Sequence, residues 1–196
     1  MHRKKLIGSD FILISLSAWL EKYIKNKQIF LLCGLYIIIV AIMGIVIIPN
    51  ICKNTGSMTI FDLKATGYDI NYAKDFINAM GVKGRGFYLK AQLPLDFIYP
   101  FVYGLLYLAL ANKAFKKLNI PVFASIMILC IADYAENILT YVMLLSHKLS
   151  PALVSTASVF TAVKTDFLYV TLTMIAFGAI LRLIKKNRGK IDEKIL

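Results

Sequence analysis

Four polar side chains interrupt an apolar stretch of the chain at helical spacing. Asp133 and Glu136 are three residues apart in the sequence. Asn137 and Thr140 each follow one of these carboxylates by four residues, so a helix would carry all four side chains on one face. Ionisable side chains within a membrane span are costly unless paired or hydrated, and they commonly mark functional sites. We expect Asp133 and Glu136 to donate or accept protons, with Asn137 and Thr140 contacting a ligand.

A second polar stripe lies along another apolar stretch. Its members recur at steps of three, four or seven residues, which indicates one helical face: Arg85, Gln92, Asp96, Tyr99, Tyr103 and Tyr107. We expect Asp96 to be catalytic and Tyr99 and Tyr103 to contact the ligand. Arg85 stands about three helical turns from Asp96, a position suited to contact with a lipid headgroup.

A proline interrupts this second stripe. Pro100 follows Asp96 by four residues and has no N–H, and its ring disturbs the helical bond to the Asp96 carbonyl. The sequence therefore predicts a kink and a free carbonyl acceptor beside the Asp96 carboxylate.

A lysine lies in the last apolar stretch. Lys164 falls in line with Thr161, whereas Asp166 points to the opposite side of the same helix. We expect Lys164 to be the counter-ion in a catalytic cluster that also contains Asp96, Asp133 and Glu136. Three carboxylates against one amine would repel one another in a low dielectric, so we expect the cluster to keep a proton or to bind a cation.

The composition indicates which elements hold these residues. Apolar residues make up 59% of the 196-residue chain, charged residues 17%, and the mean hydropathy is +0.69. Such values are typical of a membrane protein. We predict an all-α, polytopic four-helix bundle with membrane spans at 29–49, 93–112, 121–146 and 159–184.

The segments outside these spans have predictions of their own. Residues 1–28 contain an amphipathic helix that suits the membrane interface. Residues 50–92 are predicted to form a small extracytoplasmic cap, with a β-prone piece at 58–62 and a short helix at 71–80 closed by Gly81. Short loops at 113–120 and 147–158 and a tail at 185–196 complete the chain.

The basic residues predict orientation. Most of the 23 lysines and arginines lie in the N-terminal segment, the 113–120 loop and the C-terminal tail. By the positive-inside rule both termini are cytoplasmic, and we expect the bacterial plasma membrane as the location. The net charge of +12 then reflects topology, so no nucleic-acid partner is expected and membrane lipids are. The sequence indicates no particular oligomeric state.

Metal and cofactor chemistry finds little support in the residue types. The chain has two histidines and three cysteines, without a C-x-x-C or H-E-x-x-H motif. A zinc site of the usual kind needs such ligands at such spacing. We therefore expect neither a metal nor another cofactor.

Three short motifs give a resemblance. They are G-R-x-x-Y at 84–88, L-D-x-x-Y-P at 95–100 and D-x-x-E-N at 133–137. With these motifs, about half of the chain resembles small four-span bacterial membrane proteins that have no assigned activity. The resemblance implies a four-span topology and supports the choice of Asp96, Asp133 and Glu136, and it implies no reaction.

These observations lead to three functional hypotheses. The first is a protein that binds or acts on a lipid or amphipathic ligand, at a polar site in the outer half of the membrane. The second is a small proton- or cation-coupled carrier that uses the same carboxylates. The third is an accessory subunit whose polar residues only assemble helices, as such residues often do within membranes.

Overall fold

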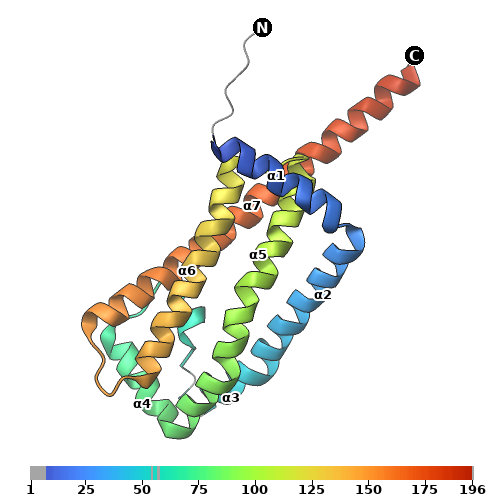
Figure 1. Cartoon of the computed structure of the whole chain (residues 1–196). Helices are drawn as coiled ribbons and strands as arrows, with labels where there is room; N and C mark the ends of the chain where they lie inside the picture. The colour runs from blue at the N-terminus through green and yellow to red at the C-terminus, as the bar shows by residue number, and fades with distance from the viewer. Residues whose placement is uncertain (1–7, 54, 57, 196) are drawn as a thin grey trace.

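The computed structural model describes residues 8–53, 55–56 and 58–195, and within them all regular structure is helical. Figure 1 shows long helices side by side, with a small folded segment at one end. The elements in chain order are α1 (Gly8–Tyr23), α2 (Asn26–Ala41), η1 (Ile42–Ile47), α3 (Ile48–Cys52), η2 (Phe61–Leu63), α4 (Ile70–Phe87), η3 (Tyr88–Gln92), α5 (Leu93–Phe115), α6 (Ile120–Leu145) and α7 (Pro151–Ile195). The predicted all-α fold is confirmed.

Four helical stretches are long and apolar enough to cross a membrane. They are Asn26–Cys52, Ile70–Phe115, Ile120–Leu145 and Pro151–Asn187. This agrees with the predicted four-span architecture. The helices extend beyond the predicted spans, since α7 begins at Pro151 and η3 joins α4 to α5 without a break.

Gly81 separates the cap helix from the second span. Its backbone has φ 61° and ψ −170°, which breaks the helical path inside α4. Glycine adopts a positive φ without the steric cost of a Cβ atom. The predicted closure of the short helix at Gly81 is therefore present, and the chain resumes a helix directly after it.

Helix α1 lies across the end of the bundle where α7 also leaves it (Figure 1). Leu13 and Leu20 of α1 are buried against this end. Ser17 fixes the contact, because its Oγ accepts a 3.0 Å hydrogen bond from the Leu118 backbone N–H, in the turn between α5 and α6. Helix α1 therefore packs across the end of the bundle, and its place at the membrane interface stays a prediction.

The cap folds onto the other end of the bundle. Phe61 and Phe76 are fully buried in its core, and the Tyr68 backbone N–H donates to Ser158 Oγ of α7 at 2.7 Å. Burial raises the pKa of the Tyr68 phenol well above its usual value. The β-prone prediction for 58–62 is wrong, because the chain forms a 3₁₀ turn at Phe61–Leu63 instead of a strand.

Candidate functional site

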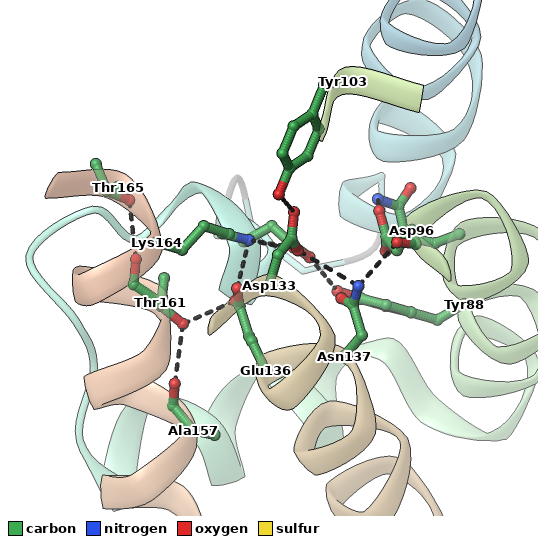
Figure 2. A network of polar contacts seen from close by, with 12 residues as sticks. Tyr88, Asp96, Tyr103, Asp133, Glu136, Asn137, Ala157, Thr161, Lys164 and Thr165 are labelled. Carbon is green, nitrogen blue, oxygen red and sulfur yellow. Dashed lines mark hydrogen bonds and ion pairs between the residues drawn. The ribbon is translucent and has the colours of Figure 1, made fainter. Parts of the chain in front are cut away.

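One lysine forms the centre of a buried ionic cluster. Lys164 Nζ of α7 lies 2.9 Å from Asp62 Oδ1, 3.5 Å from Asp133 Oδ1 and in direct contact with Glu136 Oε2. Figure 2 shows the ammonium group beside the Asp133 and Glu136 side chains. Because Asp62 comes from η2 and the other two from α6, the lysine joins the cap to two membrane helices.

Hydroxyl groups occupy the remaining oxygens of these carboxylates. Tyr103 Oη donates to Asp133 Oδ2 at 2.8 Å, and Thr161 Oγ1 donates to Glu136 Oε1 at 2.7 Å. Tyr88 Oη donates to Asp62 Oδ2 at 3.0 Å. Buried charges are tolerated when they are both paired and hydrogen-bonded, which is the situation here.

The predicted free carbonyl at Asp96 exists and has a partner. Pro100 lies inside α5, where it offers no N–H to the carbonyl of Asp96. The Asn137 side-chain amide of α6 donates to that carbonyl oxygen at 2.9 Å. It also lies 3.4 Å from Asp133 Oδ1, so Asn137 connects the kink of α5 to the ionic cluster (Figure 2).

Two buried acceptors beside this kink are left without a partner. Gln92 Nε2 donates to Asp96 Oδ1 at 3.0 Å. Among the described residues, nothing donates to Asp96 Oδ2 or to Gln92 Oε1, although Asp96 is 3% exposed and Gln92 is fully buried. An unsatisfied buried acceptor costs about 1–3 kcal/mol, so both oxygens favour a ligand that donates hydrogen bonds.

These side chains line a cavity of about 320 Å³. Its polar wall holds the Gln92 and Asp96 side chains, Tyr99 and Tyr103 of α5, and the Asp62, Asp133 and Lys164 side chains. Most of the rest is apolar and comes from the first span, the cap, α6 and α7: Val40, Met43, Ile48, Ile60, Leu63, Leu129 and Leu168. A mainly apolar cavity with a few convergent polar groups is the usual form of a small-molecule site.

The structure brings together most of the residues that the sequence singled out. Asp96, Tyr99, Tyr103, Asp133 and Lys164 line the cavity. The remaining partners of the cluster, Glu136 and Asn137, are buried directly behind its wall, in contact with Lys164 and Asp96.

Two predicted ligand contacts, Thr140 and Arg85, are arranged differently, whereas Asp166 lies where it was expected. Thr140 is buried on α6, the helix of Asp133 and Glu136, but it does not line the cavity. Asp166 is exposed on the opposite side of α7, as its spacing from Lys164 indicates. Arg85 also lies away from the cavity, and its Nε donates to the Ile77 backbone carbonyl at 3.3 Å within α4.

The displacement of Arg85 has a local cause. The segment η3 between Arg85 and Asp96 is a π-helix, whose i→i+5 bonds take up more residues per turn than an α-helix. The stripe that an unbroken α-helix would carry from Arg85 to Asp96 is therefore rotated out of phase. From Gln92 onwards the α-helical stripe holds.

Sequence reasoning missed Asp62 and Tyr88. Asp62 lies in a cap loop, where no helical period relates it to the cluster, and its one signal is an acid within the apolar run I-F-D-L. Tyr88 is the last residue of the G-R-x-x-Y motif, yet the motif gave it no role. The contacts of Asp62 with Lys164 and with Tyr88 both arise from tertiary folding of the cap.

The cluster also has the spacing of a cation site. One oxygen from each of Asp62, Asp133 and Glu136 lies within 4.8 Å of the others. The Lys164 ammonium contacts all three carboxylates and supplies the positive charge that a metal ion would otherwise provide. Hard cations such as Ca²⁺ take six to eight oxygen ligands, so Lys164 would have to move before one could bind.

Comparisons of the chain with models of protein families, with curated protein sequences and with solved structures find no match.

Proposed function

We propose that the protein binds an amphipathic ligand in the cavity between its helices, and that Asp133 and Glu136 exchange protons there with Lys164 as counter-ion. The observation that carries the proposal is a mainly apolar cavity with the Asp96 and Gln92 side chains in its wall, each of which has one oxygen without a donor among the described residues. Packing between helices alone does not require acceptors without donors.

The polar wall favours a ligand head that donates hydrogen bonds, such as an amine or a hydroxyl group. Asp62, Asp96 and Asp133 outnumber the one cation of the wall, and Lys164 is already engaged with carboxylates. A phosphate would meet these acids without a free cation. The headgroup role expected for Arg85 also finds no support, because Arg85 lies outside the cavity.

Gly44 allows the cavity to be filled without touching its polar wall. It lines the cavity, and a Cβ atom added to it would meet nothing within 4 Å. We expect Gly44→Leu to occupy the apolar space and to reduce the amount of ligand retained by the purified protein by about tenfold, an effect worth roughly 1.4 kcal/mol.

Gly34 provides a matched control for this substitution. It lies in α2 of the same span, is equally open and does not line the cavity. Native mass spectrometry of wild type, Gly34→Leu, Gly44→Leu and Asp96→Asn should show equal ligand retention by the first two and reduced retention by the other two. A bare wild-type protein, or equal retention by the Gly34 and Gly44 variants, would overturn the proposal.

A proton- or cation-coupled carrier is the second candidate. It is favoured by the three carboxylates whose oxygens lie within 4.8 Å of one another around a lysine. In this function a proton or cation would compete with the Lys164 ammonium for the carboxylates. Vesicles containing wild type should then show a pH- or cation-dependent flux that Glu136→Gln with Asp133→Asn abolishes, and a flux equal to that of empty vesicles excludes this function.

The orientation forms part of the proposal. The residues of α1 and the far end of α7 lie at one end of the bundle and the cap at the other (Figure 1). Together with the basic residues near both termini, this supports cytoplasmic termini and an outer cap in a bacterial plasma membrane. A membrane-impermeant thiol reagent should label a cysteine placed at Lys74, in cap helix α4, in intact cells. Labelling of a cysteine at Lys116 instead would show that the protein has the opposite orientation.

A further inference from the structure

A second cavity lies at the opposite end of the bundle, between the last turn of α5 and helix α7. Its volume is about 510 Å³. Four of its lining residues are basic, and none is acidic: Lys116, Arg182, Lys185 and Lys186. Phe115 and Leu181 form its apolar side. This cavity is separate from the ligand site proposed above and shares no lining residue with it.

Local structure brings these cations together. Arg182, Lys185 and Lys186 share one face of α7, because their spacing matches a helical turn. Lys116 ends α5 in the left-handed conformation, with φ 64°. Arg182 Nη1 donates to the backbone carbonyl of Lys113, so one guanidinium N–H group holds the last turn of α5 while the others are available to a ligand.

The position of the cavity along the spans indicates its occupant. The uncharged apolar run of α7 ends at Leu181, directly before Arg182, so the α7 cations stand where the apolar part of this helix ends. The adjacent surface is apolar, with Phe177 60% and Leu181 39% exposed. Basic pockets between membrane helices at this level suit anionic lipid headgroups.

We propose that this cavity binds the phosphate of an anionic phospholipid, with the acyl chains along the Phe177 side of α7. The mutual repulsion of four cations in one cavity is relieved by the anion. The apolar flank distinguishes a lipid from free phosphate, which has nothing to place there.

The test measures lipid retention by the purified full-length protein with native mass spectrometry, after incubation with phosphatidylglycerol or phosphatidylcholine. Each cation near a lipid surface contributes about a fivefold gain in binding. We therefore expect the triple variant Arg182→Gln, Lys185→Gln, Lys186→Gln to bind phosphatidylglycerol roughly a hundredfold more weakly. Phosphatidylcholine should be unaffected.

A charge-matched control removes three exposed lysines at the cap end. The variant Lys74→Gln, Lys83→Gln, Lys148→Gln loses the same net charge, and all three residues are exposed. It should bind phosphatidylglycerol as wild type does. An equal loss of phosphatidylglycerol binding in both triple variants would mean that only net charge matters, and would contradict a binding site in this cavity.

A second variant tests the cavity with all cations in place. A Cβ atom added to Gly178 would lie 2.6 Å from Phe115 Cζ, so Gly178→Leu displaces the ring that walls the cavity. We expect weaker phosphatidylglycerol binding and an unchanged response to salt. Unaltered lipid binding in this variant, or competition by millimolar inorganic phosphate as effective as that by the lipid, would contradict the proposal.

Discussion

The side-chain amide of Asn137 takes the place of a backbone donor for Asp96. Its Nδ2 lies 2.9 Å from the Asp96 carbonyl oxygen, which Pro100 leaves without its helical hydrogen bond. A freed carbonyl within a membrane span must find another donor, and here the neighbouring helix provides it. The kink of α5 and the contact between α5 and α6 therefore depend on one another.

This relationship predicts a rescue. Asn137→Ala leaves the Asp96 carbonyl unpaired and should lower the free energy of unfolding by about 1–3 kcal/mol. Adding Pro100→Ala restores a backbone N–H to that carbonyl and should recover a large part of the loss. The measurement is unfolding in mixed detergent micelles, analysed as a double-mutant cycle.

Pro121 serves as the control for that cycle. It lies in the first turn of α6, where a backbone N–H has no carbonyl of the same helix to which it could donate, so the missing N–H costs no helical hydrogen bond. Pro121→Ala should leave the Asn137→Ala defect unchanged. If it rescued the defect as well as Pro100→Ala does, the explanation through the Asp96 carbonyl would be wrong.

Lys164 should be indispensable as long as its carboxylates remain. Lys164→Met leaves Glu136, which is fully buried, without a cation and should cost about 3–5 kcal/mol of unfolding free energy. Neutralising the acids in the same protein, with Glu136→Gln and Asp133→Asn, should return most of the stability. Thermal unfolding in detergent measures both effects.

The same series separates assembly from ligand binding. The control Lys148→Met changes an exposed loop lysine and should alter stability by less than about 0.5 kcal/mol. A compensated triple variant that is stable but retains no ligand would show that the cluster does more than hold helices together. A Lys164→Met variant as stable as Lys148→Met would refute the structural role of the pair.

Gly67 should tolerate no side chain. Its φ is 83°, and a Cβ atom would lie 2.5 Å from Ser158 Oγ, the atom that accepts the hydrogen bond from the Tyr68 N–H. Gly67→Ala therefore combines a backbone cost of about 1–2 kcal/mol with the displacement of the cap from α7. We expect increased cleavage of the cap by a protease added from the cap side.

Gly56 isolates the backbone contribution. Its φ is 61°, but nothing lies within 4 Å of the added Cβ position. Gly56→Ala should lower the free energy of unfolding only by the backbone cost of a positive φ and leave the cap resistant to protease. Equal protease sensitivity in the two variants would show that contact with Ser158 is not what holds the cap.

Helical periodicity predicted the parts of the site that lie on unbroken α-helices. Asp133, Glu136 and Asn137 lie on one face of α6, and Pro100 leaves the Asp96 carbonyl without its helical hydrogen bond, so that it accepts from Asn137 instead. The inward position of Lys164 and the outward position of Asp166 follow from the same geometry.

Periodicity could not predict the parts that depend on irregular backbone. The π-helical turn η3 rotates Arg85 away from the stripe, and its apolar and polar residues carry no sign of the wider turn. Asp62 approaches Lys164 from a loop separated from it by 102 residues, a contact that only the folded cap creates. The cavity itself results from packing of the cap and helices of all four spans, and it has no local pattern in the sequence.

The pairing of Asp62 with Lys164 also constrains the order of biosynthesis. Asp62 leaves the ribosome long before Lys164, and Asp133 and Glu136 likewise precede it in the chain. Until the last span enters the bilayer, these three acids have no cation to neutralise them. We therefore expect docking of α7 to complete the cluster, and a chain truncated before Lys164 to be held by the insertion machinery or degraded by membrane quality control.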